Sequence, residues 1–495
     1  MSILHKNFIN GRWTESRSGK TFDSINPANG HIVARCTSSD ERDVAAAVEA
    51  AARAFDSWRK TPAPRRAEIL FAVAEKLKTR KEELARLVTT EMGKVLPEGR
   101  GDVQEAIDMT YYMAGEGRRC FGQTVPAEMP NKFAMSVRDP IGVVACITPW
   151  NFPTAIPCWK LMPTLALGNT CVLKPSSDTP LCAVRLVEIL VECGLPPGVV
   201  NLVLGNVGDS LVVHPNVAVI SFTGSNAVGR TVGIQAAKLG KRCHLEMGGK
   251  NAITVMDDAD LDLALEGIVW SAFGTSGQRC TAASRVLVHK AVRKKLTEML
   301  VARVKKLRHG DGLQSTTDVG PVINRAALEK IHRYVELGRH EGACVLCGGT
   351  PVLKGALAKG FFYAPTLFDN VKPTMRIAQE EIFGPVTALI EISSLEEAIA
   401  VNNAVAQGLS SAIYTRDVNR AFTAMSDLST GIVYINAGTI GAEVQLPFGG
   451  TRATGNGHRE AGQAALDTFS EWKSIYVDYS GHLQRAQIDI PAPTD

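Results

Sequence analysis

The sequence predicts an α/β protein in which parallel strands are covered by helices on both faces. Short, almost wholly apolar runs alternate with segments of helical periodicity along the 495-residue chain. Runs without polar alternation are typical of parallel strands that are buried on both faces. The length corresponds to roughly two to four domains. A content of 45% hydrophobic and 21% charged residues excludes a mainly disordered chain.

The expected elements can be placed in chain order. Asn10-Gly11 between apolar residues predicts a β-hairpin over residues 8–13, and residues 41–59 and 64–89 have helical periodicity. Strands are then expected at residues 141–148, 170–174, 200–204, 217–223, 243–246 and 252–256, and helices at residues 155–167, 181–193, 227–239 and 260–273. A second α/β unit is expected from the strand 285–289 and the helix 293–307, followed by loops rich in Gly and Pro at 347–365 and 381–386. The β-rich stretch 472–477 should be a strand that needs a partner, which another subunit could provide.

The composition limits the partners of the chain. Lys plus Arg number 54 and Asp plus Glu 50, so a net charge of +4 gives no indication of a nucleic-acid or membrane partner. The sequence has no apolar run of about 18 residues and no recognisable signal peptide, so a soluble, cytoplasmic protein is expected. The 11 cysteines are expected to be reduced thiols. For the single CxxC motif, Cys344 to Cys347, a strand followed by a glycine turn is favoured over zinc or redox chemistry, and no metal site is expected.

Two segments place reactive side chains in constrained loops. Cys280 follows a glycine-bracketed loop, which frees a side chain from packing. A nucleophilic thiol needs this access and a lowered pKa, and the adjacent Arg279 could raise the thiolate fraction. Asn151 lies between two prolines after an apolar strand, where a rigid amide N–H is suited to stabilise an oxyanion. Taken alone, a packing cysteine and an ordinary turn asparagine explain both residues.

Two further segments lie at strand ends. Glu246 ends an apolar strand in front of two glycines, where a carboxylate can act as a general base. Residues 221–229 form a strand, a glycine turn and a helix start, which can offer N–H groups to a phosphate. The sequence contains no complete GxGxxG, Walker A or HExxH motif. Each of the four segments is a weak signal by itself.

Together, these segments resemble the aldehyde dehydrogenase superfamily. The matching motifs are PWNFP (149–153), Lys-Pro (174–175), FTGS (222–225), LEMGG (245–249), GQRC (277–280), EEIFGP (380–385) and PFGG (447–450). They occur in the family's order and span almost the entire chain. The resemblance implies an aldehyde dehydrogenase-like α/β fold with a Rossmann-type dinucleotide-binding domain (1–120 and 141–248) and an α/β catalytic domain (249–454). It also implies a small β oligomerisation element with the C-terminal tail (121–140 and 455–495), and a homodimer or homotetramer.

The same resemblance implies the roles of individual residues. Cys280 would attack an aldehyde carbonyl, and the Asn151 side chain and the Cys280 N–H would hold the oxyanion. Hydride would pass to a nicotinamide, and Glu246 would activate the water that hydrolyses the resulting thioester. The implied cofactor-binding residues are Ile147, Thr148, Trp150, Lys174, Ser177, Gly224, Ser225, Gly229, Glu381 and Phe383.

One departure from the family pattern concerns the choice of cofactor. NAD-preferring relatives usually carry Glu three residues after the motif lysine, whereas this chain has Ser177. A carboxylate at that place would repel a 2′-phosphate, and a serine beside Lys174 can accept one. The expected cofactor is therefore NADP or NAD, with NADP favoured.

The substrate-binding residues implied by resemblance are Arg279, Glu105, Gly441 and Ala442. In relatives that act on semialdehydes or phosphorylated aldehydes, an Arg before the nucleophile contacts the distal anionic group. In α-aminoadipic semialdehyde dehydrogenases, a Glu on the tunnel helix holds the amino group, and loop N–H groups hold the carboxylate. The α-ketoglutaric semialdehyde type shares GQRCT, so the two substrates are about equally favoured. The alternatives are a loop arginine and a helix glutamate that are merely solvated.

Other functions are weighed against this interpretation. If the protein has no site for a substrate anion, the alternative is a broad-range aldehyde dehydrogenase that acts on neutral aldehydes. A cysteine hydrolase would need an activating His, and no histidine stands in a recognisable motif. A non-catalytic structural relative would be expected to lose its catalytic residues, and a CoA-acylating variant would not need Glu246.

Overall fold

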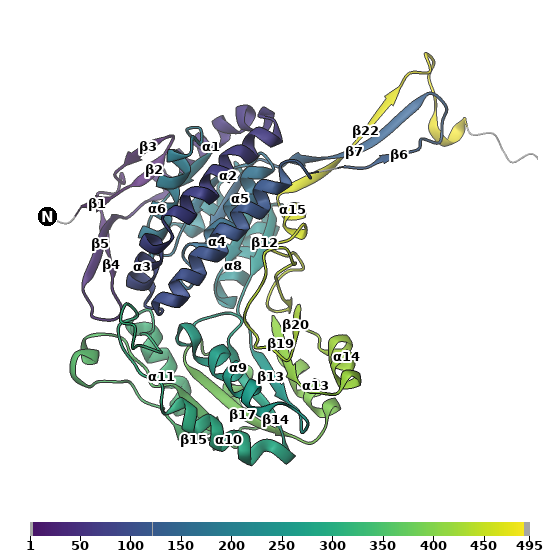
Figure 1. The fold of residues 1–495 in the computed structure, drawn as a ribbon. Coiled ribbons are helices and arrows are strands. Elements are labelled where there is room, and N and C mark those ends of the chain that lie inside the picture. Colours follow the sequence, from purple (N-terminus) through teal and green to yellow (C-terminus); the bar gives the residue numbers. More distant parts are fainter. Residues whose placement is uncertain (1–2, 121, 490–495) are drawn as a thin grey trace, which may run out of the picture.

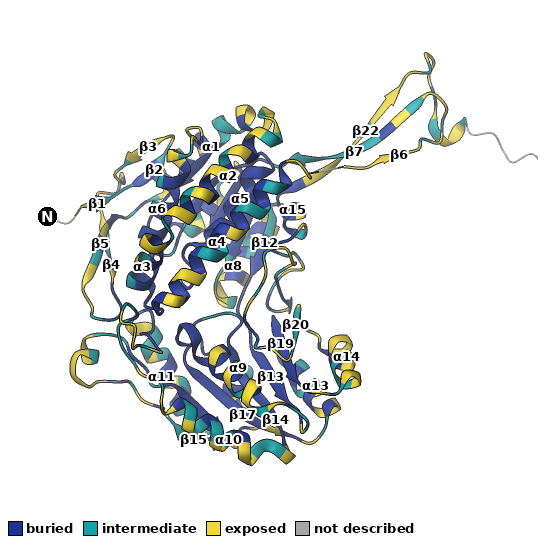
Figure 2. Cartoon of the chain, in the orientation of Figure 1, coloured by how far each residue is buried: buried dark blue, intermediate teal, exposed yellow. Residues whose placement is uncertain are grey.

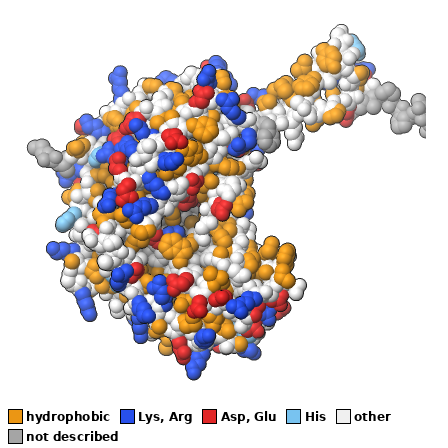
Figure 3. Space-filling view, in the orientation of Figure 1, with side chains coloured by type: hydrophobic (Ala, Val, Ile, Leu, Met, Phe, Trp, Pro, Cys, Tyr) orange, Lys and Arg blue, Asp and Glu red, His pale blue; other side chains and the backbone are white. Residues whose placement is uncertain are grey.

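Two seven-stranded sheets and a projecting three-stranded arm make up the molecule (Figure 1). The computed structural model describes residues 3–120 and 122–489. The expected α/β class is confirmed, because each large sheet is mainly parallel and has helices on both faces. The sheets lie in the upper and lower halves of the view, with a hollow between them in the space-filling picture (Figure 3).

The first sheet has the strand order β12-β11-β8-β9-β10-β2-β3. Its strands are β2 (Asn7–Ile9), β3 (Arg12–Thr14), β8 (Val143–Ile147), β9 (Thr170–Lys174), β10 (Val200–Leu202), β11 (Val217–Thr223) and β12 (Arg242–Glu246). The first five in this order are parallel, and the predicted β2–β3 hairpin adds an antiparallel edge. Asn10 and Gly11 both have positive φ, as a two-residue hairpin turn requires.

Helices cover both faces of this sheet. Alternate residues of β8 point to opposite sides, so Val144 and Cys146 join one apolar core while Val143 and Ala145 join another. The helices of this half are α1 (Glu41–Lys60), α2 (Ala63–Thr79), α3 (Lys81–Met92), α4 (Leu96–Glu116), α5 (Ala155–Ala166), α6 (Pro180–Glu192), α7 (Gly208–Val213) and α8 (Asn226–Lys238). Buried residues are concentrated on the sheet-facing sides of these helices (Figure 2).

The helical periodicity expected over residues 64–89 is confirmed, but the segment is interrupted once. The chain forms α2 and α3, which meet at Arg80. The Arg80 guanidinium pairs with Glu83 in the next helix and with Glu192 at the end of α6. A partner that is more than a hundred residues away in the chain helps fix this break, so helical periodicity alone does not reveal it.

The second sheet has the strand order β15-β16-β17-β14-β13-β19-β20 and is parallel except for β15. Its strands are β13 (Asn251–Val255), β14 (Ala283–His289), β15 (Cys344–Cys347), β16 (Thr366–Asp369), β17 (Val386–Ile392), β19 (Ser410–Tyr414) and β20 (Ile432–Ile435). The surrounding helices are α9 (Leu261–Phe273), α10 (Lys290–Val304), α11 (Arg325–His340), α12 (Arg376–Gln379), α13 (Leu395–Asn403) and α14 (Val418–Asp427). Cys344 and Cys347 thus lie in a strand that is followed by two glycines, as expected.

An antiparallel arm projects from the body of the molecule (Figure 1). It consists of β6 (Thr124–Val125), β7 (Lys132–Pro140) and β22 (Ser470–Asp478), in the order β22-β7-β6. The expected strand over residues 472–477 is confirmed, and β7 of the same chain pairs with β22 along its whole length. β22 is an edge strand of this sheet. Hydrophobic side chains are exposed along the arm, among them Phe133, Trp472 and Tyr476 (Figure 3).

Smaller elements complete the described chain. They are β1 (Leu4–His5), β4 (Thr21–Ile25), β5 (Ile32–Thr37), β18 (Gln407–Gly408), β21 (Thr451–Arg452), α15 (Ala464–Thr468) and the short 3₁₀ turns η1 (Gly274–Gly277), η2 (Gly355–Lys359) and η3 (Ala486–Ile488). Over residues 3–120 and 122–489, every helix is too short or too polar to cross a membrane.

Candidate active site

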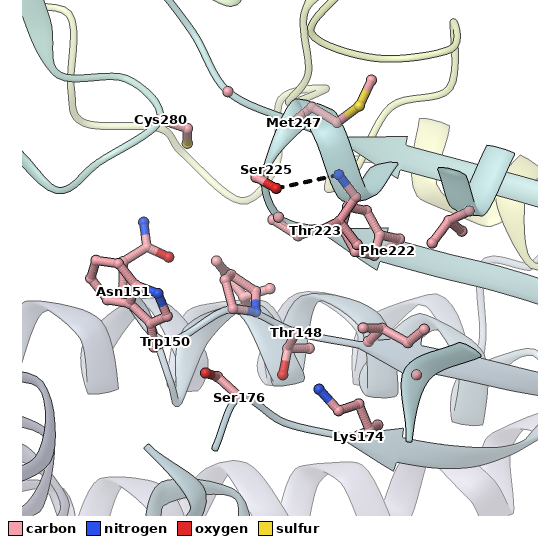
Figure 4. Close-up of a pocket in the computed structure, with 18 of the residues that line it drawn as sticks. Thr148, Trp150, Asn151, Lys174, Ser176, Phe222, Thr223, Ser225, Met247 and Cys280 are labelled. Carbon is pink, nitrogen blue, oxygen red and sulfur yellow. Dashed lines mark hydrogen bonds between the residues drawn. The ribbon is translucent and has the colours of Figure 1, made fainter. Parts of the chain in front are cut away.

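A cavity of about 460 Å³ opens where the parallel strands of the first sheet end (Figure 4). The carboxyl ends of parallel strands are the usual ligand-binding edge of such sheets. Ten residues predicted from the sequence line this cavity: Ile147, Thr148, Trp150, Asn151, Lys174, Gly224, Ser225, Cys280, Glu381 and Phe383. Segments from both large sheets therefore face one space.

The cavity wall also differs from the prediction. Ser176 lines it and Ser177 does not, so the expectation that Ser177 faces the cofactor pocket is not supported. The Ser176 hydroxyl lies on the same side as Thr148 and Lys174 in Figure 4. Residues that sequence reasoning missed are Pro149, Ile156, Ser176, Asn206, Gly208, Asp209, Phe222, Thr223, Val228, Val232, Met247, Gly248 and Lys330. Asn206, Gly208 and Asp209 follow β10, and their place after a strand is the signal that could have found them.

The start of α8 presents backbone N–H groups to the cavity. Ser225 caps the helix, and its Oγ accepts a hydrogen bond from the N–H of Val228 at 3.4 Å. Gly229 does not line the cavity. It lies within α8, where a Cβ would stand only 2.4 Å from Sδ of Met247, so glycine permits the close packing of α8 on β12. An exposed helix start of this kind suits a phosphate.

Lys174 reaches the cavity from the end of β9, and its ammonium group points inward (Figure 4). Burial lowers the pKa of Lys174, and the nearby carboxylates Asp178 and Asp209 oppose this effect. A half-buried ammonium group that faces a cavity suits an anionic or hydroxyl-rich ligand.

Glu381 and Phe383 enter the cavity from the loop in front of β17. The Glu381 carboxylate accepts a hydrogen bond from the N–H of Gly249 at 3.0 Å, and burial raises its pKa. A Cβ at Gly248 would lie 2.0 Å from this carboxylate, which explains why glycine stands there. The Phe383 ring meets the Trp150 ring edge-on at 5.4 Å. Two aromatic rings thus border one part of the cavity.

The loop in front of Cys280 has an unusual backbone. Thr275, Ser276 and Gly277 have φ values of 53°, 54° and 67°, so three successive residues are left-handed. Each such non-glycine residue costs about 1–2 kcal/mol. A Cβ at Gly277 would lie 2.1 Å from the carbonyl oxygen of Gly384, so only glycine fits there. The loop must therefore be held by contacts from outside.

Hydrogen bonds from several other segments hold this loop. The N–H of Thr275 donates to the buried Glu98 carboxylate at 2.7 Å, and the Ser276 hydroxyl donates to the Gly320 carbonyl at 2.7 Å. The Gln278 side-chain oxygen accepts from the N–H of Ile323 at 2.9 Å. Glu98 lies on α4, which belongs to the other half of the molecule (Figure 1).

Asn151 is bound directly to the nucleophile loop. Its Nδ2 donates one N–H to the Gln278 carbonyl oxygen at 3.0 Å, and the amide carries a second N–H. Asp102 of α4 accepts from the N–H groups of Thr154 and Ala155 at 3.3 and 2.8 Å, and so anchors the end of the Asn151 loop. Asp102 also pairs with Lys94 at 3.0 Å, with both side chains fully buried. This geometry places an amide donor beside the thiol.

The expectation that Arg279 raises the thiolate fraction of Cys280 is wrong. Burial raises the pKa of the Cys280 thiol, and the carboxylates Glu381 and Glu246 raise it further. The Arg279 guanidinium instead donates to Thr275 Oγ1 at 2.8 Å and lies 3.4 Å from Glu98. The resting side chain is therefore a thiol.

Glu246 is buried at the end of β12 and does not line the cavity. Burial and the neighbouring Glu460 carboxylate raise its pKa well above the ordinary range. When ionised, Glu246 raises the pKa of the Cys280 thiol further. A carboxyl group with a raised pKa suits proton transfer near neutral pH.

Two of the predicted substrate-binding residues are near each other. The pKa of Glu105 is raised to about 8 by burial and by Asp102, while Arg279 acts in the opposite direction. The Arg279 guanidinium lies between the rings of Phe152 and Trp270, at 5.2 and 5.0 Å from their centroids. The structure therefore gives Arg279 several partners of its own.

The other two predicted substrate-binding residues lie in a loop after β20. Gly441 is exposed with a φ of 112°, and Ala442 packs against the core that contains Met109 and Trp159. This core belongs to α4 and α5, the same helices that border the Asn151 loop.

The chain matches the model of the aldehyde dehydrogenase family over residues 13–475. It is 42% identical to the alpha-ketoglutaric semialdehyde dehydrogenase of Bacillus subtilis, over 95% of this chain and 97% of that one. It is 39% identical to the NADP(+)-linked succinate-semialdehyde dehydrogenase GabD of Escherichia coli, over 95% and 97%. Among solved structures, betaine aldehyde dehydrogenase of Staphylococcus aureus in complex with NAD+ is similar. Its TM-score is 0.95 at 35% identity, covering 97% of this chain and 96% of that chain.

The Glu98 contact predicts a specific loss of stability. Glu98→Ala removes the acceptor of a buried N–H group and should lower the free energy of unfolding by about 1–3 kcal/mol. Glu98→Gln keeps an acceptor oxygen and should lose less than half of that amount. Urea denaturation of the three proteins measures the difference. Equal losses in the two variants would show that the charge of Glu98, and not its acceptor oxygen, holds the loop.

Proposed function

Because the chain belongs to the aldehyde dehydrogenase family, we propose that it oxidises a carboxylate-bearing semialdehyde to the corresponding acid with NADP or NAD. The observation that supports this proposal best is one cavity lined by both a cysteine thiol and a helix start suited to phosphate. A thiol that acted as a simple hydrolase would have no use for the second feature. In this proposal, Cys280, Asn151 and Glu246 carry the chemistry.

The residues around the cavity fit a dinucleotide. The start of α8 at Ser225 can bind the pyrophosphate, and Lys174 and Glu381 can bind ribose hydroxyl groups. Trp150 and Phe383 provide ring faces for the flat bases. When bound, the nicotinamide accepts the hydride that leaves the substrate carbon. We assign residues 1–120 and 141–248 to cofactor binding and residues 249–454 to catalysis.

The chain's own residues perform the remaining steps. The Cys280 sulfur attacks the aldehyde carbon, and because its pKa is raised, the thiol proton must pass to water as the C–S bond forms. The second N–H of the Asn151 amide and the backbone N–H of Cys280 stabilise the oxyanion, and loss of the hydride from the substrate carbon leaves a thioester. Glu246 then takes a proton from the water that attacks the thioester, the C–S bond breaks to release the acid, and the Cys280 sulfur regains a proton from water.

The proposed substrate is a 2-oxo semialdehyde of the alpha-ketoglutaric type. Two relatives with 42% identity, from Bacillus subtilis and Haloferax volcanii, carry that substrate in their names. The pKa of Glu105 near 8 also favours it, because a mostly neutral carboxyl group donates to a keto or carboxylate oxygen. An α-amino substrate would need a charged carboxylate at this place. Arg279, Gly441 and Ala442 are assigned to the distal carboxylate.

The assembly and location of the enzyme are also proposed. Exposed aromatic side chains on an arm that projects from the body suit burial against another copy of the chain, and we assign residues 121–140 and 455–495 to a homodimer or homotetramer contact. Residues 121 and 490–495 of these segments lie outside the described residues. All 11 cysteines are free thiols, which supports a cytoplasmic location.

Substitutions of the two central residues should separate the chemical steps. Cys280→Ala should reduce aldehyde oxidation below about 1% while cofactor binding persists, since the nucleophile does not hold the dinucleotide. Glu246→Gln should still release one burst of reduced cofactor and then stall at hydrolysis. Stopped-flow absorbance of the reduced cofactor measures both. If the burst itself is lost in Glu246→Gln, the carboxyl group acts earlier, on the thiol.

The cavity wall predicts which serine decides the cofactor. Ser176→Glu should place a carboxylate against a 2′-phosphate and shift the NADP/NAD ratio of kcat/KM towards NAD by roughly 10–150-fold, which corresponds to about 1.5–3 kcal/mol. Ser177→Glu is the matched control, because Ser177 does not line the cavity and should change the ratio much less. A larger effect at position 177 would show that the second serine faces the ribose.

The charge of the substrate provides a further test. A four- to six-carbon semialdehyde should exceed the neutral aldehyde of equal length in kcat/KM by roughly 10–150-fold, since one charge-assisted hydrogen bond contributes about 1.5–3 kcal/mol. Arg279→Ala should remove most of this difference. Glu105→Gln should spare the keto acid, to which an amide also donates, and impair an α-amino semialdehyde. Equal wild-type activity on charged and neutral aldehydes would leave only a broad-range enzyme.

A further inference from the structure

Behind the proposed base lies a row of four buried titratable side chains. Lys160 belongs to α5, His244 and Glu246 belong to β12, and Glu460 follows β21. Along this row, Lys160 Nζ lies 2.5 Å from Glu460 Oε1, His244 Nδ1 lies 3.6 Å from the same oxygen, and His244 Nε2 lies 3.5 Å from Glu246 Oε1. The imidazole thus has one nitrogen towards each carboxyl group. All four side chains are at most 5% exposed.

Lys160 fixes the hydrogen-bonding role of the Glu460 carboxyl group. Lys160 Nζ donates to Glu460 Oε1 and also to the Ser221 hydroxyl at 3.1 Å, and its side chain is fully buried. Because an ammonium group can only donate hydrogen bonds, Glu460 Oε1 is the acceptor in this contact.

The carboxylate in turn fixes the tautomer of the ring. His244 is neutral, since burial and the nearby cations Lys160 and Arg459 lower its pKa well below the ordinary value, as does His458. A neutral imidazole carries one proton. Nδ1 lies 3.6 Å from the oxygen that already accepts from Lys160, so we assign the proton to Nδ1, and Nε2 then presents a lone pair to Glu246.

A lone pair at this place distinguishes the two forms of Glu246. It repels a carboxylate oxygen and accepts a hydrogen bond from a carboxylic acid, once the 3.5 Å separation shortens by about half an ångström. We propose that His244 is a positioning residue for the reaction: its Nε2 holds the protonated Glu246 side chain between turnovers, away from the cavity that Cys280 lines. The inference rests on the proposed role of Glu246 as the base.

Other groups near Glu246 also influence its protonation. The Glu460 carboxylate favours the protonated form, and Lys160 and Arg459 favour the ionised form. On the remaining side the backbone of Gly449 packs so closely that a Cβ there would lie 2.5 Å from Glu246 Oε1. Among the described neighbours, the His244 ring is therefore the group whose removal takes away a potential hydrogen-bond acceptor for Glu246 without changing a charge.

The test is the pH dependence of thioester hydrolysis in single turnovers. Glu246 must be ionised to act, so hydrolysis slows as the pH falls through its pKa. His244→Leu removes the acceptor that favours the protonated form, which should lower this pKa and move the acid limb down by about one pH unit. His244→Gln keeps an acceptor oxygen and should move it less. His458→Leu is the matched control, because His458 neighbours the His244 ring at 5.9 Å and should leave the limb in place.

The following results would contradict the proposed role of His244. An acid limb that stays in place in His244→Leu, or that moves equally in His244→Leu and His244→Gln, overturns the inference. If His244→Leu does not fold, infrared difference spectra of the wild type against Glu246→Gln decide, since the wild type should show the carbonyl stretch of a protonated carboxyl group at neutral pH. Absence of that band also overturns the inference. Normal hydrolysis by Glu246→Gln would instead refute the proposed base.

Discussion

The hydrogen bond from Thr275 to Glu98 is the constraint on which the active-site geometry depends. Two non-glycine residues in left-handed conformation store about 2–4 kcal/mol in the loop in front of Cys280. A buried carboxylate that accepts from this backbone stabilises the strained turn. Local sequence preference opposes this conformation, and a distant side chain maintains it.

Helix α4 extends this control to the second catalytic loop. Glu98 and Asp102 are four residues apart on one helix, so their carboxylates lie one turn apart on the same face. The first holds the nucleophile loop of one sheet, and the second holds the end of the Asn151 loop of the other sheet. One stiff helix therefore contacts both loops, in addition to the direct hydrogen bond from Asn151 to the Gln278 carbonyl oxygen. Lys94 neutralises Asp102 inside the protein, which permits its burial.

Features that depend on local sequence could be predicted, and features that depend on distant partners could not. Asn10-Gly11 specifies its own turn, and the strands of the first sheet are recognisable because their side chains are buried on both faces. The break at Arg80 and the pairing of β22 with β7 are determined by residues far away in the chain. The motifs correctly predicted that Cys280 and Asn151 line the cavity. They did not predict that Arg279 pairs with Glu98, because Glu98 lies in no recognisable motif. Ser176 and Ser177 are adjacent in the sequence, and a sequence pattern does not predict which of two neighbouring side chains points into the cavity.

The late position of Glu460 in the chain has a consequence for biosynthesis. The cofactor cavity is built almost wholly from segments before residue 250, with Cys280, Lys330 and the residues around Glu381 added later. The carboxylate that pairs with Lys160 and faces His244 is synthesised some 200 residues after Glu246, and β22 follows it. Until then, a nascent chain holds Lys160 without its counter-ion in a forming core. Completion of the β12 surroundings and closure of the arm thus belong to the last stage of folding, when contacts of large sequence separation form.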